Sequence, residues 1–368
     1  MRIGFLGAGR IGSFHAAALA GTDGVDELLI ADADAARAAV LADRIGGRAH
    51  TGGQGRIGGQ GGTDARARAD GRAPARTRAA ESVDAVFAAG VDAVVIATAT
   101  AAHAGLIARA ARAGLPAYCE KPIALDLPGT LRALREVEAA GTLLQLGFQR
   151  RFDAGYRAAR EAVRSGRLGR LHTIRAVTSD AAPPPAEFLP LSGGLIRDCL
   201  VHDFDAVRWL TGREVAEVFA RGSANGAEFF RTAGDVDTAA ALLTLDDGTL
   251  VTATATRYNG AGYDVRMELA GERGQLVVGL DARTPFASAE PGGPAAPEHP
   301  WGGFLERFGA AYRAELAAFV RAAAGEAPNP CSGREALHAL LVAEACERSR
   351  RTGRAVAMAE FTEETAAL

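Results

Sequence analysis

The chain has 368 residues, of which 48% are hydrophobic and 23% charged, with a formal net charge of −3. Its length exceeds that of a single hydrophobic core, so two domains are expected. The charge gives no electrostatic case for binding nucleic acid or an anionic membrane, and no apolar run approaches the ~18 residues of a membrane span. The N-terminus shows no signal-peptide pattern, and no C-x-x-C spacing occurs among Cys119, Cys199, Cys331 and Cys346. We therefore expect a cytoplasmic protein whose cysteines are reduced and mostly structural.

A glycine-rich turn follows the first expected strand, Ile3–Leu6, and opens a helix that runs to Ala20. In this G-x-G-x-x-G pattern the first glycine permits a tight turn, the second lets the backbone approach a pyrophosphate, and the third lets helix pack on strand. The helix N-terminus also offers N–H groups to the phosphates. Because a strand precedes the turn and a helix follows it, the pattern predicts dinucleotide binding by Gly7, Gly9, Arg10, Ile11 and Gly12.

Asp32 ends the second expected strand, Glu27–Ala31, and lies 20 residues after Gly12. A carboxylate at this distance is expected to bind the ribose of the dinucleotide. The alternative is a cap on the helix that starts near Asp34, and the two roles can coexist. Because a carboxylate would repel a 2′-phosphate, Asp32 favours NAD over NADP.

The composition changes between Gly46 and about Ala80, where Gly, Arg, Ala and Gln dominate. Such a segment buries too little apolar surface to offset its ordering entropy, which predicts a flexible insertion over residues 46–80. Its arginines suggest RNA binding as an alternative, but no aromatic residue lies among them to stack on bases. We therefore expect no contact with nucleic acid.

Alternating strands and helices complete a doubly wound first domain by about residue 150. The expected elements are a helix at Ser82–Ala88, an apolar strand within Asp92–Thr98, a helix at Ala101–Ala113, a strand at Ala117–Cys119, a helix at Leu127–Ala140 and a strand at Leu143–Gly147. Ligands of open α/β sheets bind beyond the carboxyl ends of the strands. Five candidate cofactor residues are expected at these ends, namely Thr98, Thr100, His103, Glu120 and Lys121.

Lys121 is the single lysine among 41 basic residues, the others being arginine. One explanation is a codon bias that spared one position. The other is a need for proton chemistry, because a lysine can shift its pKa whereas a guanidinium stays charged. Its position at the carboxyl end of a parallel strand favours the second explanation.

The pattern changes over residues 151–368 and predicts an α+β domain with a largely antiparallel sheet. The expected elements are helices at Gly155–Ser165, Ile196–Leu210, Leu305–Ala324 and Arg334–Arg351, and strands at Leu171–Val177, Val215–Arg221, Ala239–Leu245, Leu250–Arg257, Val265–Ala270 and Gln275–Val278. Asp247-Gly248 marks a hairpin turn. Asp198 and His202 are at i and i+4 of one expected helix and therefore share a face.

In their order and spacing, five motifs resemble the family of glucose-fructose oxidoreductase, inositol dehydrogenase and MocA. These are the turn at 7–12, Glu120-Lys121-Pro122, the segment 147–153, Ser192-Gly193-Gly194 and the segment 198–205. Within the family the inositol 2-dehydrogenases are most similar, through the segments 149–156 and 198–210 and Gly262-Tyr263-Asp264. Ala261 stands where some of them are expected to have an aromatic residue, which leaves the particular polyol open.

The resemblance implies NAD-dependent oxidation of a secondary hydroxyl of a cyclic polyol, with myo-inositol to 2-keto-inositol as the best candidate. Such a reaction needs a base, and histidine has its ordinary pKa nearest working pH. We expect His202 to be that base, Asp198 to orient it or the substrate, and Lys121 to stabilise the developing alkoxide. Polyol contacts are expected from Lys121, Arg150, Asp180, Asp198, His202 and Tyr263.

Several alternatives stay open. Arg150 can equally pair with a carboxylate, Tyr263 can belong to the core, and His103 can be a capping or surface residue rather than a contact to nicotinamide or substrate. The enzyme could act on another sugar or sugar derivative with NAD or NADP, or the chain could be a cofactor-binding regulator without catalysis. A metal site is improbable because no third set of ligands is evident. The resemblance also implies a homo-oligomer, a dimer or tetramer.

Overall fold

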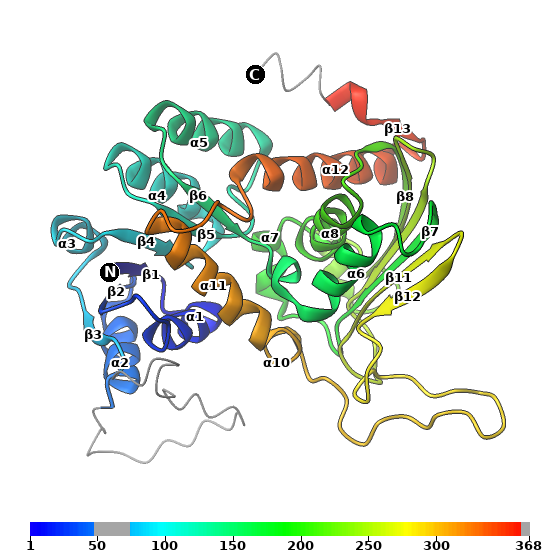
Figure 1. The fold of residues 1–368 in the computed structure, drawn as a ribbon, viewed down its shortest axis with the longest axis horizontal. Helices are drawn as coiled ribbons and strands as arrows, with labels where there is room; N and C mark the ends of the chain where they lie inside the picture. The colour runs from blue at the N-terminus through cyan, green and yellow to red at the C-terminus, as the bar shows by residue number, and fades with distance from the viewer. Residues whose placement is uncertain (48–73, 362–368) are drawn as a thin grey trace. The chain divides into compact units, whose positions relative to one another are not determined.

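The computed structural model describes residues 1–47 and 74–361. The chain divides into two compact units (Figure 1). The first comprises Met1–Gly147 with Tyr312–Ala336, and the second comprises Phe148–Ala311 with Leu337–Leu368. The predicted fold class is confirmed, because the first unit contains a parallel sheet and the second a largely antiparallel one.

The first unit is built on six parallel strands in the order β3-β2-β1-β4-β5-β6. The strands are β1 Arg2–Leu6, β2 Glu27–Ala31, β3 Arg76–Ala79, β4 Ala93–Ile96, β5 Ala117–Glu120 and β6 Leu144–Gly147. The order reverses between β1 and β4, and ligands of doubly wound sheets bind at such a point. Every residue of β2 and β4 is buried, as expected for strands covered on both faces.

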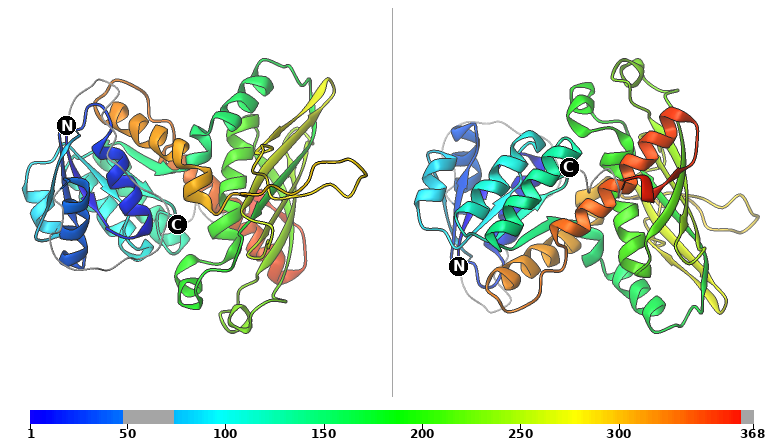
Figure 2. Two further views of the ribbon diagram at one scale, coloured as in Figure 1. Left: turned by 90° about the horizontal axis from the view of Figure 1, so that it is seen from below. Right: turned by 90° about the horizontal axis from the view of Figure 1, so that it is seen from above.

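Helices lie on both faces of this sheet (Figure 2). They are α1 Arg10–Ala20, α2 Ala35–Ile45, α3 Val83–Ala88, α4 Thr100–Arg112 and α5 Leu127–Ala140. Helix α11, Gly309–Ala323, adds Leu316, Phe319 and Val320 to the core formed with β1, β2 and α1. The sequence analysis placed all of residues 151–368 in the second domain, whereas the apolar face of α11 belongs to the first unit.

Part of the expected insertion at 46–80 is a strand, and there the prediction was wrong. Arg76–Ala79 forms β3, which pairs in parallel with β2 and is the edge of the sheet. Its side chains are mostly exposed, so no apolar pattern marks it; backbone pairing and an Arg78–Glu27 ion pair hold it. Residues 48–73 of the expected insertion lie outside the described residues.

The second unit is built on a seven-stranded sheet in the order β12-β11-β7-β10-β9-β8-β13. The strands are β7 Leu171–Ser179, β8 Val215–Ser223, β9 Thr238–Leu245, β10 Leu250–Thr256, β11 Asp264–Gly271, β12 Gly274–Val278 and β13 Val356–Ala357. Only the β7–β10 pair is parallel, and β9 and β10 form the predicted hairpin around Gly248.

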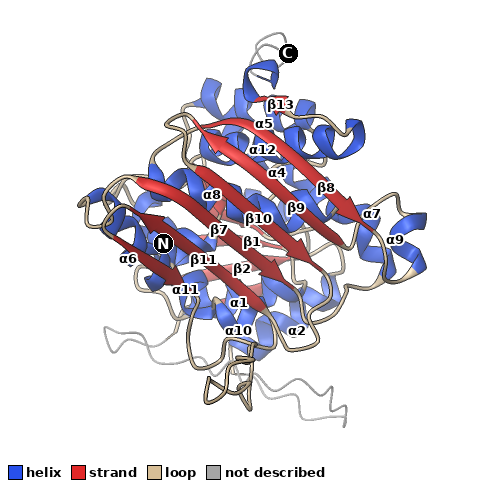
Figure 3. Cartoon of the chain, turned by 90° about the vertical axis from the view of Figure 1, so that its right-hand side faces the viewer, coloured by secondary structure: helices blue, strands red, loops and turns tan. Residues whose placement is uncertain are grey.

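Helices of the second unit cover one face of its sheet. They include α6 Ala154–Arg164, α8 Val201–Thr211 and α12 Gly333–Thr352, and short helices form at α7 Leu189–Ser192, α9 Glu228–Thr232 and α10 Phe304–Arg307. Figure 3 shows the opposite face of the sheet without a covering helix among the described residues. Leu242 and Leu250 are 44% and 45% exposed on β9 and β10.

Two expected helices are interrupted. The first, expected at 196–210, begins as a π-helical turn at Ile196–Leu200 before α8. The second, expected at 305–324, is broken at Phe308, whose backbone (φ −109°, ψ 11°) leaves the helical region between α10 and α11. All four cysteines are buried, and no helix among residues 1–47 and 74–361 is long and apolar enough to cross a membrane.

Candidate active site

The glycine-rich turn has the geometry that its three glycines predict. Gly7 has a φ of +107°, and a Cβ there would overlap the carbonyl oxygen of Ala97. A Cβ on Gly12 would overlap the carbonyl oxygen of Gly7, so a side chain is excluded where α1 packs on β1. A Cβ on Gly9 would meet nothing within 4 Å. The open space therefore lies at the glycine that a pyrophosphate is expected to approach.

The start of α1 fits a dinucleotide phosphate. Gly9 is the N-cap of the helix and supplies no side-chain cap, so the first turn keeps its N–H donors for another acceptor. Gly9 and Arg10 are exposed at this end. Uncapped N–H groups at a helix N-terminus favour an anion.

Asp32 lies directly after β2 and is held by two backbone donors. One carboxylate oxygen accepts from Ala8 N at 2.6 Å and the other from Asp34 N at 2.9 Å. Each oxygen keeps a further lone pair, so the carboxylate can also accept from a ribose diol. The capping alternative for Asp32 was wrong, because Asp34 is the N-cap of α2 and accepts from Ala36 N and Arg37 N.

The residues after β4 and β5 are tied together by His103. The histidine ring is 1% exposed, with Nδ1 2.7 Å from Pro122 O and Nε2 3.1 Å from Thr98 O. The Lys121–Pro122 peptide bond is cis. Burial contradicts a surface role for His103, which links the two strand ends instead. Thr98, Thr100, Glu120 and Lys121 lie at the same ends, as predicted from their positions after the strands.

The carboxylate of Glu120 is held from within the first unit. Its Oε1 lies 2.6 Å from Nε2 of His15 on α1 and 3.2 Å from the hydroxyl of Tyr118. Burial raises the pKa of Glu120, but the hydrogen bond from His15 and the charges of His15, Lys121 and His103 outweigh that effect and lower the pKa. Tyr118 OH also lies 3.1 Å from a carboxylate oxygen of Glu315 on α11.

His15 is a polar partner that the sequence analysis did not find. The ring is fully buried, and its Nδ1 has no hydrogen-bond partner among the described residues. The rings of Tyr118 and Tyr312 lie at 5.8 and 5.4 Å from it. Because a buried N–H without an acceptor is unfavourable, the proton belongs on Nε2, which donates to Glu120. A single buried histidine on an Ala-rich helix gives no sequence signal for this role.

In the second unit, Arg257 joins two of the predicted substrate residues. One guanidinium nitrogen donates to Asp180 at 2.7 Å and the other to Asp198 at 2.6 Å. The sequence analysis had Arg257 as the last residue of an expected strand and gave it no role. The sequence did contain one sign of such a role, namely a charged residue directly after the alternating buried and exposed residues of β10.

Arg150 forms a buried ion pair, which is the alternative that the sequence left open. Its guanidinium donates to Asp203 and, at 2.8 Å, to the hydroxyl of Thr178, which itself donates to Asp203 at 2.8 Å. Arg150 is 2% exposed and Asp203 fully buried. Burial raises the pKa of the nearby Tyr263 phenol, so Tyr263 stays protonated and keeps a hydroxyl donor.

His202 lies in the first turn of α8, immediately after the π-helical turn that carries Asp198. The i, i+4 geometry assumed for these residues is therefore not that of one regular α-helix, and single π-helical turns are frequent at functional sites. The His202 ring packs edge-on against Phe148, with centroids 5.6 Å apart. His202 is partly buried and its neighbour Asp203 holds Arg150.

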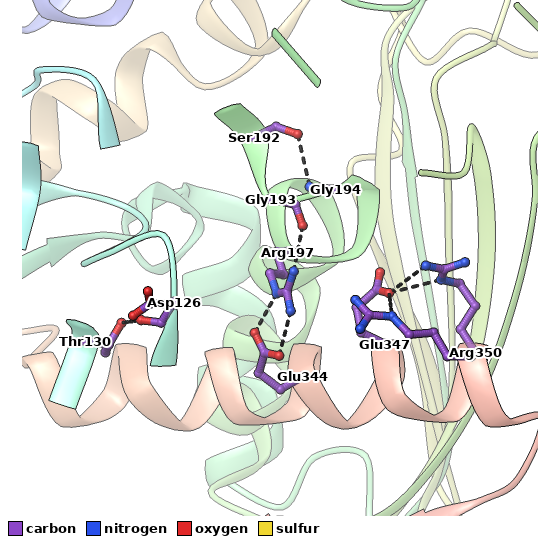
Figure 4. Close-up of polar contacts among 10 residues, drawn as sticks. Asp126, Thr130, Ser192, Gly193, Gly194, Arg197, Glu344, Glu347 and Arg350 are labelled. Carbon is purple, nitrogen blue, oxygen red and sulfur yellow. Dashed lines mark hydrogen bonds and ion pairs between the residues drawn. The ribbon is translucent and has the colours of Figure 1, made fainter. Parts of the chain in front are cut away.

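The Gly-Gly segment before this turn is bonded to Arg197 of the turn, which α12 holds in place (Figure 4). Gly193 and Gly194 have φ values of +79° and +94°, which side chains disfavour. Arg197 donates to Gly193 O at 3.1 Å and forms two bonds with Glu344 of α12, at 2.5 and 2.7 Å. Asp198 is thus presented from a turn with a defined backbone.

The predicted site residues therefore gather in two groups. The first unit brings the glycine-rich turn, Asp32 and the ends of β4 and β5 to the carboxyl edge of its sheet. In the second unit, Arg257 joins Asp180 to Asp198, and the charges of Arg150 and Asp180 act on the buried Tyr263 phenol. Among the described residues, no group of three His, Cys, Asp or Glu side chains could hold a metal ion.

Comparison with known proteins identifies the two halves separately. Residues 1–148 match the model described as "Oxidoreductase family, NAD-binding Rossmann fold", and residues 156–277 match the GFO/IDH/MocA C-terminal domain. A myo-inositol dehydrogenase of Streptomyces leeuwenhoekii, Hyg17, is 38% identical over 356 residues, covering 96% of this chain and 98% of the relative.

Solved structures agree with this assignment over nearly the whole chain. A myo-inositol dehydrogenase from Corynebacterium glutamicum has a TM-score of 0.81 at 31% identity, covering 97% of this chain and 98% of its own. A scyllo-inositol dehydrogenase from Lactobacillus casei, with bound NAD(H) and scyllo-inositol, has a TM-score of 0.77 at 26% identity, covering 98% and 99%. The chain belongs to the GFO/IDH/MocA family of oxidoreductases with an NAD-binding Rossmann fold.

Proposed function

We propose that this protein is an NAD-dependent dehydrogenase that oxidises myo-inositol to 2-keto-inositol. The observation that carries the substrate class is the pair of part-exposed carboxylates at Asp180 and Asp198, which Arg257 holds side by side. A ring with many hydroxyls needs several donors and acceptors placed around it. Inositol dehydrogenases are also among the relatives that match this chain over nearly its full length.

The cofactor is NAD, held by the first unit. Bound NAD supplies the nicotinamide that accepts a hydride from the substrate carbon. Its pyrophosphate would lie against Gly9 and the N-terminus of α1, and its ribose against Asp32. Arg10, Ile11, Thr98, Thr100 and Glu120 complete the proposed cofactor set.

The chemistry is assigned to Lys121, Asp198 and His202. His202 accepts the hydroxyl proton as general base, since an imidazole titrates near neutral pH. Asp198 orients the imidazole or a substrate hydroxyl, and the ammonium of Lys121 stabilises the alkoxide that develops. Arg150 acts indirectly in this proposal, because Asp203 and Thr178 take its guanidinium.

Charge favours a neutral polyol over a sugar phosphate. Arg257 is shared by the carboxylates of Asp180 and Asp198, and Asp203 compensates Arg150. An anionic substrate would meet the carboxylates of Asp180 and Asp198, which repel it. Ala261, where an aromatic residue is expected in some inositol dehydrogenases, keeps another cyclitol as the second candidate.

A homo-oligomer through the open sheet face is part of the proposal. Leu242 and Leu250 are almost half exposed on the face of the seven-stranded sheet that no described helix covers. Apolar side chains on one face of a sheet favour a partner. We place the enzyme in the cytoplasm, where its four buried cysteines would stay reduced.

The first experiment is NADH or NADPH formation with myo-, scyllo- and chiro-inositol, glucose, xylose and their phosphates. Turnover of myo-inositol with NAD and little turnover of any phosphate is expected. Turnover of sugars alone would contradict the cyclitol assignment. His202→Ala should abolish the rise of rate with pH, and an unchanged profile would assign the base to another residue.

A further inference from the structure

Arg257 lies at a position that the backbone fixes from both sides. Strands β7 and β10 run in parallel with Ser179 opposite Thr256, so Asp180 and Arg257 are the next residues of neighbouring strands. The backbone N–H of Asp180 donates to Thr256 O at 2.9 Å, and that of Arg257 donates to Asp237 O at 2.8 Å. The backbone position from which the Arg257 side chain extends is therefore as well defined as that of a residue within a strand.

The guanidinium is buried while its two carboxylate partners reach the surface. The side chain of Arg257 is 5% exposed, whereas those of Asp180 and Asp198 are 24% and 16% exposed. Arg257 is thus poorly placed to touch a ligand, but both carboxylates can. A planar guanidinium can hold two carboxylates at once, with a separate N–H for each.

Two carboxylates that share one site repel each other, and one of them would tend to take up a proton. Arg257 removes this tendency, because each carboxylate has its own charged hydrogen bond at 2.6 or 2.7 Å. It also connects two independent elements, the end of β7 and the π-helical turn that carries Asp198. Arg257 therefore bridges the two carboxylates and holds them at a set distance from each other.

We propose that Arg257 is a positioning residue that keeps Asp180 and Asp198 ionised and at a fixed spacing, so that together they accept hydrogen bonds from two hydroxyls of the polyol. This inference rests on the proposed function. It predicts that Arg257 acts on polyol binding and on the acid side of the pH profile, and leaves NAD binding unchanged.

The test compares Arg257→Gln, Arg257→Lys and a matched control, Arg151→Gln. Arg151 also forms a buried ion pair in the second unit, with Asp205, and the two side chains are 4% and 0% exposed. For each protein, kcat and KM for myo-inositol are measured across pH, with NAD affinity from protein fluorescence and Tm from thermal unfolding.

For Arg257→Gln we expect kcat/KM to fall by roughly 10- to 100-fold, mainly through KM, as for other groups that orient a functional side chain. The acid limb should move to higher pH by about one unit, because the carboxylates protonate more readily without the cation. Arg257→Lys should return the acid limb of the pH profile to its wild-type position but leave KM raised. An ammonium keeps the positive charge but lacks the planar guanidinium that bonds both carboxylates. The proposal would be overturned if Arg257→Gln and Arg151→Gln lost the same factor in kcat/KM and had their acid limbs at the same pH.

A second measurement needs no substrate and separates this inference from the proposed function. In Arg257→Gln the two carboxylates lose the charge of Arg257, and taking up a proton relieves their mutual repulsion, so the Tm deficit relative to wild type should shrink between pH 8 and pH 5. Adding Asp180→Asn and Asp198→Asn should remove this pH dependence. If the wild-type protein turns over no cyclitol, the proposed function fails, but a Tm deficit that shrinks at low pH still supports the role of Arg257. A Tm deficit that stays constant with pH overturns that role.

Discussion

The two groups of site residues are built in different ways. At the sheet edge of the first unit, the binding features are made by backbone: a turn without side chains, uncapped N–H groups and a carboxylate held by Ala8 N and Asp34 N. In the second unit the features are side-chain charges held by partners that are distant in sequence, as Asp180, Asp198 and Arg257 are. A backbone site depends on local sequence, whereas a site of paired charges depends on the tertiary fold.

Among substitutions in the first unit, Lys121→Arg is expected to have the largest effect on turnover. The fold and NAD affinity should persist, while kcat falls by roughly 100-fold or more, because a bulkier guanidinium cannot shift its pKa or take part in proton transfer. Steady-state kinetics and NAD titration measure the two quantities. Near wild-type turnover would mean that the single lysine has no chemical role.

Asp203→Asn tests the largest effect on the stability of the second unit. Arg150 would be left buried without a compensating charge, which should cost about 3 kcal/mol in the free energy of unfolding. Asp246→Asn is the control, because Asp246 is 45% exposed and pairs with Arg213 at 3.9 Å, so a change within about 0.5 kcal/mol is expected. Denaturant unfolding measures both, and equal losses would show that burial of the pair is irrelevant.

Gly9→Ala and Gly12→Ala distinguish a glycine that leaves room for the cofactor from one that lets helix α1 pack on strand β1. A Cβ on Gly9 meets no protein atom within 4 Å, so this variant should keep its Tm and lose NAD affinity by roughly 10-fold. A Cβ on Gly12 overlaps the carbonyl of Gly7, so that variant should lose about 1 to 3 kcal/mol of stability. Similar Tm values for both would contradict the assigned geometry.

His15→Leu tests the smallest effect, the hydrogen bond to Glu120. The pKa of Glu120 is lowered in the folded protein, so its charged form adds stability above the ordinary pKa of 4.5, and this stability is lost as pH falls through the folded value. The variant should be less stable than wild type by about 1 kcal/mol at neutral pH, with a smaller difference below pH 4.5. A deficit that grows on acidification would assign His15 another role.

The same contrast explains what the sequence could and could not predict. The turn at Gly7 to Gly12, Asp32 and the strands of both sheets other than β3 and β13 followed from short patterns, because glycine spacing and apolar periodicity reflect local backbone geometry. Arg257 and His15 were missed because their partners are 59 and 105 residues away. The edge strand β3 was missed because an Arg-Thr-Arg-Ala segment held by backbone pairing shows no apolar pattern.

Helix α11 has a consequence for how the protein is made. Leu316, Phe319 and Val320 belong to the core of the first unit, yet they are synthesised about 170 residues after its last strand, β6, which ends at Gly147 (316 − 147 = 169). At ribosomal rates of ~5–20 residues per second, the nascent first unit waits on the order of ten seconds or longer with part of its core uncovered. A chaperone that binds apolar surface can bind the nascent chain during that interval. In a protein truncated after Gly147, this part of the core would stay uncovered.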